Sequence, residues 1–318
     1  MNDRAWAVLR PHRVAIVGVG RVGATYAYTL LTRGTVGEIV LVDIDRERTE
    51  GEAMDLSHAA PLANPVRVWT GDYNDCRTAD VVVLTAGASQ RPGETRMDLL
   101  RRNAAVFSDI VPRVAGQGIL LVATNPVDVM SQVAWKLSGL PSRQVVGSGT
   151  VLDTARFRHL LGRAVGVDPR NVHAYIIGEH GDSEVAAWSR TTVAGVPLDE
   201  FCLRTACPVS TVDREGIFEA TRGAAQDIIS RKGATYYAVA AALSRITDAI
   251  LHNQHAVLSV STLAPSALGL GEVYLSLPAV VGRDGVERVV PLPLSPDEQQ
   301  ALERSAAVLR QAVDELSY

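Results

Sequence analysis

The sequence predicts an α/β fold in which an N-terminal doubly wound parallel sheet precedes a C-terminal α+β part. Three observations lead to this prediction. Short apolar runs of strand length alternate with helical stretches up to about residue 150. A glycine-rich turn directly follows the first of these runs. Beyond about residue 150 the pattern changes to longer helices and a series of neighbouring strands.

The first half contains six short apolar runs, as expected for parallel strands that are buried on both faces. These runs are residues 13–18, 38–43, 66–70, 80–85, 118–124 and 144–147. Helical stretches lie between most of them, at residues 22–32, 46–58, 95–115 and 127–137. Strands that alternate with helices indicate a parallel doubly wound sheet. Residues 1–12 are interpreted as an N-terminal arm, and residues 13–149 as the first domain.

Residues 150–318 are interpreted as a second, α+β domain that is joined tightly to the first. Its expected helices are 152–165 and 212–252, the second breaking near Lys232 and Gly233, and its strand-like segments are 172–177, 188–193, 257–263, 272–281 and 286–290. A last helix begins at Ser295, a capping residue that is followed by Pro296 in the first turn.

The composition excludes several classes of protein. The 318 residues are 47% hydrophobic and 21% charged, which is ordinary for a globular protein. The charges, 31 basic and 35 acidic, are spread along the chain, so no basic block predicts nucleic-acid binding. No apolar run has the length of a signal-peptide core or a membrane span. Cys76, Cys202 and Cys207 lack metal-ligand spacing, so we expect no metal site and reduced thiols in the cytoplasm.

Residues 18–23 (GVGRVG) form a dinucleotide-binding fingerprint in the right context, because they follow a strand and open a helix. The glycines permit a tight turn, a close approach to a pyrophosphate and close helix–sheet packing. Asp43 ends the second strand and is suited to accept hydrogen bonds from a ribose, which favours NAD over NADP. The first domain is therefore expected to be of the Rossmann type. The alternatives are that the glycines only form a turn and that Asp43 only caps the next one.

A histidine and an Asp–Arg pair suit hydride transfer to a 2-keto acid. Reduction of a ketone needs an acid with a pKa near neutrality, and His180 stands in a glycine-flanked turn. Asp153 and Arg156 are spaced i to i+3 and leave one helix face. An aspartate can orient a histidine, and arginine grips a carboxylate with two hydrogen bonds. The alternatives are a structural His180 and an Asp153–Arg156 pair on the surface.

The chain resembles the lactate and malate dehydrogenase family from about residue 13 to its end, and the bacterial L-lactate dehydrogenases most of all. Six motifs occur in the family's order: residues 18–23, 85–88 (TAGA), 91–96 (RPGETR), 124–128 (TNPVD), 152–157 (LDTARF) and 178–182 (GEHGD).

The resemblance implies a role for each motif. His180 carries the proton and is held by Asp153, while Arg156 grips the substrate's carboxylate. Residues 87–96 form a lid that brings Arg96 to the carbonyl oxygen, unless Arg96 is only a surface residue. Asn125 lies where it reaches both the nicotinamide ribose and the substrate. The implied cofactor is NAD, and its contacts are Gly18, Gly20, Val22, Gly23, Asp43, Arg48, Tyr73, Gly87, Ala88, Thr124, Asn125 and Ser148.

Gln90 is the residue that discriminates best between substrates. In the family, an Arg at this lid position pairs with the second carboxylate of oxaloacetate, whereas Gln is typical of enzymes for pyruvate. Thr235 implies a small polar pocket wall and agrees with pyruvate and L-lactate. Arg91 is adjacent to Gln90, so a shift of one residue in the loop would favour malate dehydrogenase. A noncatalytic NAD-binding scaffold is the alternative from another class.

Arg158 and His173 correspond to an anion site for fructose 1,6-bisphosphate between subunits in many bacterial lactate dehydrogenases. Both residue types are suitable phosphate ligands. The alternative is a solvent-facing Arg158 and a His173 that is hydrogen-bonded in a strand. The resemblance also implies a homotetramer.

Overall fold

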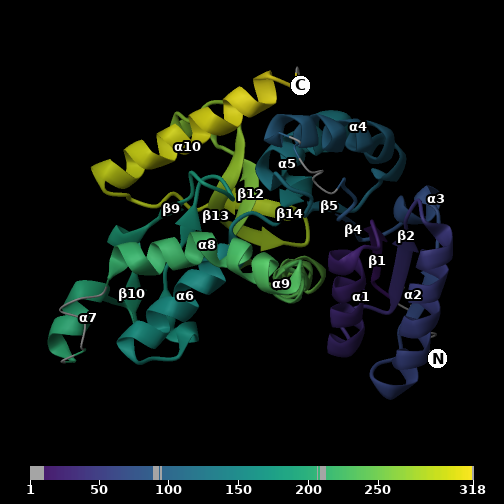
Figure 1. Ribbon diagram of the computed structural model, residues 1–318, viewed down its shortest axis with the longest axis horizontal. Coiled ribbons are helices and arrows are strands. Elements are labelled where there is room, and N and C mark those ends of the chain that lie inside the picture. The colour runs from purple at the N-terminus through teal and green to yellow at the C-terminus, as the bar shows by residue number, and fades with distance from the viewer. Residues whose placement is uncertain (1–10, 89–92, 94, 206, 208–212, 317–318) are drawn as a thin grey trace, which may run out of the picture.

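A computed structural model describes residues 11–88, 93, 95–205, 207 and 213–316. Most of the interpreted N-terminal arm, residues 1–10, lies outside the described residues. Figure 1 shows one sheet running through the centre of the molecule with helices on both of its faces.

The central sheet has nine strands in the order β14-β13-β12-β6-β5-β4-β1-β2-β3. Six of them are parallel and match the runs predicted from the first half of the chain. They are β1 (Arg13–Val17), β2 (Glu38–Val42), β3 (Arg67–Thr70), β4 (Val81–Leu84), β5 (Ile119–Val122) and β6 (Val145–Gly147). The chain reverses its strand order between β1 and β4, and in doubly wound sheets ligands bind at this point, beyond the carboxyl ends of the strands.

The remaining three strands come from the second half of the chain and extend the same sheet. They are β12 (Ala256–Leu263), β13 (Tyr274–Gly282) and β14 (Gly285–Val289), which form an antiparallel meander. Ser261 of β12 pairs with Gly147 of β6 and joins the two halves. The meander was predicted, but its continuity with the parallel sheet was not.

Successive residues of β1 enter two different cores, which explains why the parallel strands are apolar throughout. Ala15 and Val17 belong to the core beneath the helices α4 and α5, whereas Val14 and Ile16 belong to the core beneath α1 and α9. The helices around the sheet are α1 (Arg21–Arg33), α2 (Arg46–Ala59), α3 (Tyr73–Cys76), α4 (Arg96–Val114), α5 (Val127–Ser138), α9 (Tyr237–Leu251) and α10 (Pro296–Asp314). As predicted, Ser295 caps α10 and its hydroxyl accepts a hydrogen bond from Glu298 N–H.

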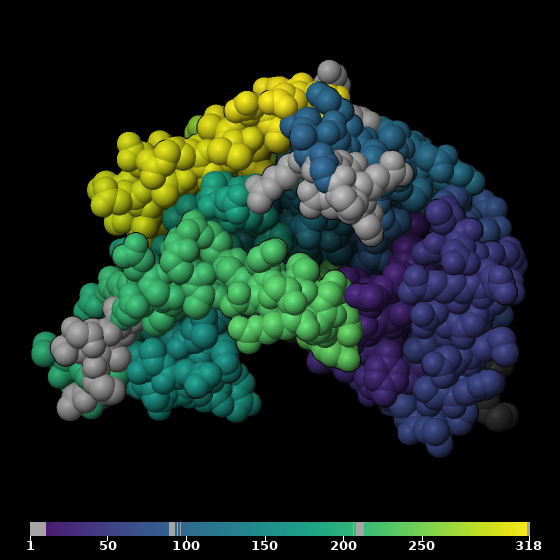
Figure 2. Space-filling view, viewed as in Figure 1, coloured from purple at the N-terminus to yellow at the C-terminus, as the bar shows by residue number. Residues whose placement is uncertain are grey.

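Helix α9 crosses from the second half of the chain to pack on α1, and the two lie together in the space-filling view (Figure 2). The buried Tyr26 hydroxyl lies 2.6 Å from the hydroxyl of Thr247. Arg33 and Asp248 form an ion pair of 2.5 Å at the end of the same contact. These polar contacts hold the C-terminal half of α9 against α1.

A smaller unit carries the helices α6 (Val151–Val165), α7 (Leu198–Arg204) and α8 (Arg214–Lys232). Its short strands are β7 (Val172–His173), β8 (Ile176–Ile177), β9 (Val185–Ala186), β10 (Thr192–Val193) and β11 (Val196–Pro197). The predicted break in the long helix is confirmed, because Gly233 ends α8 with a φ of 80°. The prediction of one strand over 188–193 is wrong, because Trp188–Arg190 forms a 3-10 turn. The short turns are η1 (Ala60–Leu62), η2 (Ser142–Gln144), η3 (Pro169–Asn171), η4 (Trp188–Arg190) and η5 (Ser266–Leu268).

Candidate functional site

The glycine fingerprint forms the turn between β1 and α1, and each glycine has a different environment. Gly18 has a φ of 101°, and a Cβ there would lie 2.3 Å from the Ala86 nitrogen. A Cβ on Gly23 would lie 2.1 Å from the carbonyl oxygen of Gly18. A Cβ on Gly20 would meet nothing within 4 Å. The turn is therefore closely packed at Gly18 and Gly23 and open at Gly20. Helix α1 begins there without a side-chain cap, so its first N–H groups can bind an anion.

Asp43 fixes this turn to the end of β2. Its Oδ2 accepts a hydrogen bond of 2.6 Å from Val19 N–H, and its Oδ1 accepts one of 3.1 Å from Asp45 N–H. Asp43 thus does stabilise a turn, as the alternative interpretation has it. Each carboxylate oxygen can accept more than one hydrogen bond, so acceptor capacity is left for a ribose.

The loops after β4 and β5 are held together by Asn103 of α4, which is 2% exposed. Its Oδ1 accepts the N–H of Ala88 at 2.8 Å, and its Nδ2 donates to the Asn125 carbonyl at 2.9 Å. Thr124 donates to the Ala86 carbonyl at 2.7 Å. A Cβ on Gly87 would lie 2.7 Å from Thr124 Cγ2. Four predicted cofactor residues, Gly87, Ala88, Thr124 and Asn125, therefore share one network with a residue that was not predicted.

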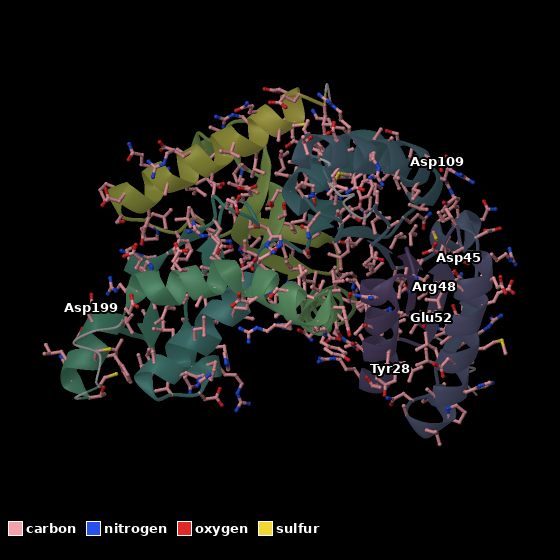
Figure 3. The ribbon with its side chains drawn as sticks, viewed as in Figure 1. Tyr28, Asp45, Arg48, Glu52, Asp109 and Asp199 are labelled. Carbon is pink, nitrogen blue, oxygen red and sulfur yellow. The ribbon has the colours of Figure 1, made fainter. Side chains whose placement is uncertain are left out.

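The other predicted cofactor residues lie around this edge of the sheet. Val22 is half-buried in α1, and Ser148 follows β6 and donates its N–H to Val122 at 2.8 Å. Arg48 is exposed on α2 near Asp45, which caps the helix, and near the half-buried Glu52 (Figure 3). Its guanidinium lies 3.8 Å from the Glu52 carboxylate. Tyr73 begins α3, and the Arg113 guanidinium lies 4.1 Å from its ring centroid.

Asp153 lies between His180 and Arg156 and contacts both. One carboxylate oxygen is 2.6 Å from His180 Nδ1, and the other accepts a hydrogen bond of 2.9 Å from Arg156 Nη1. The exposed fraction is 3% for the side chain of Asp153, 12% for Arg156 and 27% for His180. The fold thus brings these three predicted residues together, and the alternative of an Asp153–Arg156 pair on the surface is wrong.

The charges of this triad reinforce one another. Burial would lower the pKa of His180, but the Asp153 carboxylate raises it to about 9. Burial would raise the pKa of Asp153, but His180 and Arg156 together bring it below its usual value. The arrangement therefore favours an imidazolium beside a carboxylate at neutral pH.

The backbone of His180 is held by Asp128 in the first turn of α5. Asp128 Oδ2 accepts the N–H of His180 at 2.7 Å, and its Oδ1 lies 3.3 Å from the Ser276 hydroxyl. Burial raises the pKa of this carboxyl to about 6. The Ser305 hydroxyl accepts the neighbouring N–H, that of Glu179, at 2.8 Å. Asp128 belongs to the motif of residues 124–128, from which no role was predicted for it.

Two predicted residues of the lid, Gln90 and Arg96, are not covered by the contacts given above. Gln90 lies outside the described residues. Arg96 is the first residue of α4, where Thr95 forms a capping box with Asp98, and its side chain is outside the described part of the structure. Thr235 is half-buried in the loop between α8 and α9.

Arg158 and His173 lie on adjoining elements of the smaller unit. Arg158 Nε donates to the Ala174 carbonyl at 2.9 Å, and its guanidinium lies 5.1 Å from the Tyr175 ring centroid. Arg158 lines a cavity of about 280 Å³ together with Arg170 and Arg245. His173 is exposed on β7 and pairs with Thr192.

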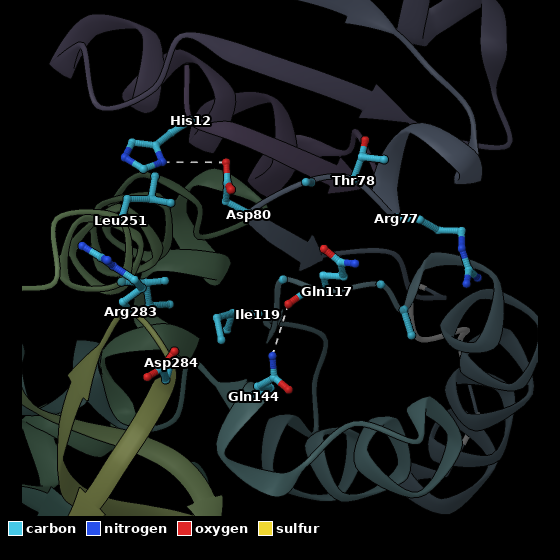
Figure 4. A pocket seen from close by; sticks show the side chains of 15 residues that line it. His12, Arg77, Thr78, Asp80, Gln117, Ile119, Gln144, Leu251, Arg283 and Asp284 are labelled. Atoms are coloured by element: carbon cyan, nitrogen blue, oxygen red, sulfur yellow. Dashed lines mark hydrogen bonds and ion pairs between the residues drawn. The ribbon is translucent and has the colours of Figure 1, made fainter. Parts of the chain in front are cut away.

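A cavity of about 880 Å³ lies at the opposite, amino edge of the sheet (Figure 4). Its walls carry charges of both signs, among them Arg77, Arg283 and Asp284. His12 Nδ1 lies 3.7 Å from an Asp80 carboxylate oxygen. The glycine turn and His180 are not among its lining residues. The glycine turn follows the carboxyl end of β1, and we therefore place the candidate site at the carboxyl edge of the sheet.

Within the described ranges, no group of three or more His, Cys, Asp or Glu side chains is placed to hold a metal ion. No helix in the same part of the chain is long and apolar enough to span a membrane.

Comparison with protein families accounts for nearly the whole chain. Residues 12–147 match the lactate/malate dehydrogenase, NAD binding domain, and residues 150–317 match the lactate/malate dehydrogenase, alpha/beta C-terminal domain. The chain belongs to the lactate/malate dehydrogenase family. The resemblance inferred from six motifs, the α/β fold and the NAD-binding domain are thereby confirmed.

Relatives and solved structures of this family are similar over almost their full length. The L-lactate dehydrogenase of Priestia megaterium is 48% identical over 96% of both chains. That of Acetivibrio thermocellus is 49% identical over 96% of this chain and 97% of its own. A lactate dehydrogenase from a Medee basin deep-sea metagenome library has a TM-score of 0.93 at 46% identity, covering 98% of this chain and 100% of its own. The minor L-lactate dehydrogenase of Enterococcus mundtii in its ligands-bound form has a TM-score of 0.92 at 42% identity, covering 96% of this chain and 98% of its own.

Proposed function

We propose that the protein is an NAD-dependent L-lactate dehydrogenase that interconverts pyruvate and L-lactate. The observation that carries the proposal is the buried contact of Asp153 with both His180 and Arg156. It supplies a proton carrier, a group that orients this carrier, and a cation that can grip a carboxylate, within a few ångströms of one another. The names of the relatives support the choice of lactate as the product.

The chain's residues would act as follows. His180 is held as an imidazolium by Asp153, so its Nε2–H can donate a proton to the ketone oxygen as the carbonyl carbon is reduced. In the reverse direction the neutral imidazole accepts the proton of the lactate hydroxyl. Arg156 holds the carboxylate in one orientation, and Arg96 from the lid would stabilise negative charge on the oxygen.

The open glycine turn fits a dinucleotide. Gly20 faces unfilled space, α1 begins uncapped, and Asp43 is fixed beside the turn with acceptor capacity to spare. Residues 18–23 would hold the pyrophosphate and Asp43 the adenosine ribose, with the other predicted contacts around them. When bound, NADH supplies the hydride for the carbonyl carbon. We propose residues 13–149 as the domain for the cofactor and 150–318 as that for the substrate.

The experiment that tests this function compares NADH oxidation with pyruvate and with oxaloacetate. We expect pyruvate to be preferred in the wild-type protein, with Gln90 and Thr235 shaping the pocket. Gln90→Arg should shift the ratio of kcat/KM toward oxaloacetate by at least about tenfold, because a second carboxylate would then find a charged partner. Preference for oxaloacetate in the wild type would favour malate dehydrogenase, and inactivity with both substrates would favour a noncatalytic scaffold.

We also propose an anion site for fructose 1,6-bisphosphate at Arg158 and His173, within a cytoplasmic homotetramer. The cavity that Arg158 lines with Arg170 and Arg245 supports an anionic ligand. We expect the bisphosphate to lower KM for pyruvate about fivefold or more, and Arg158→Gln and His173→Gln each to abolish this response. Arg190→Gln, an exposed arginine elsewhere in the smaller unit, is the control. An unchanged KM in the wild type would disprove the site, and sedimentation would measure the tetramer.

A further inference from the structure

Besides Asp153 and Asp128, a third carboxyl group is buried at the site of His180. Glu184 follows His180 by four residues and directly precedes β9, and it is 6% exposed. Its Oε1 is buried and has no hydrogen-bond partner within the described part of the chain. No motif in the sequence singled out this residue.

Charged groups face Glu184 from three sides. Asp153 and Arg156 come from α6, His180 from its own loop, and Arg222 from α8. Arg222 is engaged elsewhere, because it pairs with Glu219 and donates to the Asp182 carbonyl at 3.3 Å.

The remaining acids of this region already have hydrogen-bond donors. Glu179, on the same loop, accepts the hydroxyl and the N–H of Ser183. Asp128 of α5 lies behind His180 and accepts its N–H. Among Asp153, Glu179, Asp128 and Glu184, Glu184 is thus the acid with a buried oxygen that has no hydrogen-bond donor in the described part of the structure.

Two carboxyl groups that share one buried site do not both ionise readily. Asp153 has a donor on each oxygen, from His180 and from Arg156, so it keeps the negative charge. Glu184 Oε1 has no such donor among the described residues, and burial together with the charge of Asp153 raises the pKa of Glu184 to about 8. Because the two acids and the histidine interact, their protons are lost in steps that belong to the group as a whole.

We propose that Glu184 carries a second proton of the active site, and that this proton must be present for the carboxylate of a 2-keto acid to bind at Arg156. The inference rests on the proposed function. With Glu184 neutral, the charges of His180, Asp153, Arg156 and the bound substrate cancel. With Glu184 ionised, the same complex carries one more negative charge in a buried site that already holds the carboxylates of Asp153 and Asp128, which is unfavourable.

The pH profile of kcat/KM for pyruvate, at saturating NADH from pH 6 to pH 10, distinguishes one required proton from two. Wild-type kcat/KM should fall at alkaline pH by about a hundredfold per pH unit, because His180 and Glu184 both lose protons. In Glu184→Gln it should fall by about tenfold per unit, because only His180 titrates. At pH 6.5 the two proteins should have similar kcat/KM, since glutamine imitates the neutral acid. Glu200→Gln, an exposed glutamate paired with Arg204 on α7, should keep the wild-type profile.

Proton uptake gives a second readout that does not depend on turnover. Oxamate, an isostere of pyruvate, is bound to the NADH complex in buffers of different ionisation enthalpy, and calorimetry yields the protons taken up. Above about pH 8, wild-type protein should take up more protons than Glu184→Gln, with the difference approaching one. Because wild-type uptake alone must exceed what one group can supply, the test holds even if the variant folds poorly.

The two hypotheses fail in different ways. Wild-type protein that reduces pyruvate with a profile of tenfold per unit, and that takes up no more protons than the variant, would overturn the role of Glu184 alone. Wild-type protein that neither reduces pyruvate nor binds oxamate at pH 6.5 would overturn the proposed function, and this inference with it.

Discussion

Replacing Asp153 with asparagine is expected to lower kcat/KM for pyruvate by about 10² to 10⁴-fold at neutral pH. Asp153 offers two acceptor oxygens, one to His180 and one to Arg156. Asparagine has one acceptor and one donor, so its amide would oppose either the guanidinium or the protonated Nδ1. In the second case the imidazole must accept at Nδ1 and can no longer be an imidazolium.

The pH profile identifies the cause of this loss. Because Asp153 is the main group that raises the pKa of His180 to about 9, the variant should lose activity at a lower pH than the wild type. Asp168→Asn is the matched control, since Asp168 contacts Arg170 at 2.6 Å on the exposed surface. A variant that loses activity while its alkaline limb stays in place would show that Asp153 acts on geometry alone.

The same pair makes stability depend on pH. The folded-state pKa of His180 is about 9, above the usual value of 6.5. Its contribution to the free energy of unfolding is therefore fully present below about pH 6.5 and is lost as the pH rises through about 9. Urea denaturation of the wild type and of Asp153→Asn should show this alkaline loss in the first protein and a smaller one in the second.

The parallel part of the fold could be predicted because its strands are buried on both faces. A run such as residues 81–84 is apolar at every position, and Gly18 marks the turn that follows such a strand. Short runs are less informative. Residues 188–193 were predicted as a strand, yet Trp188 packs edge-on against Phe157 from a 3-10 turn, with ring centroids 4.7 Å apart. A run of six residues meets the need for burial in either conformation.

Pairings between distant segments are outside the reach of periodicity. The join of β12 to β6 depends on Ser261 facing Gly147, where a Cβ on the glycine would lie 2.6 Å from Ser261 Cβ. The local sequence pattern of neither strand predicts that the two strands pair. The same holds for Asn103, whose amide connects two loops that are remote in the sequence.

The sequence predicted which residue types and motifs belong to the site, but it predicted few of the contacts between them. His180, Asp153 and Arg156 could be named because their types fit one reaction, but only the fold brings them together. Asp128 and Glu184 are single carboxylates, and their importance comes from burial. One feature of the sequence could have indicated Glu184. It is an acid that stands four positions after His180 and directly before the apolar residues Val185 and Ala186, where burial without a partner would be costly.

Replacing Arg156 with lysine is expected to weaken binding of pyruvate and oxamate by about a hundredfold or more, which corresponds to about 3 kcal/mol. Lysine keeps the positive charge that faces Asp153 but lacks the planar fork that holds a carboxylate with two hydrogen bonds. The loss should appear in KM for pyruvate and in the dissociation constant of oxamate. The affinity for NADH should stay within about twofold of wild type, because Arg156 lies on α6, away from the glycine turn.

Arg163→Lys is the matched control, because Arg163 is exposed near the end of the same helix. The comparison separates the geometry of the fork from the charge of the helix. If lysine at position 156 retained wild-type affinity for oxamate, Arg156 would not be the carboxylate clamp, and its contact with Asp153 would serve only to orient the acid that holds His180. If NADH affinity fell as far as oxamate affinity, the substitution would have disturbed the fold, and circular dichroism of both variants would show it.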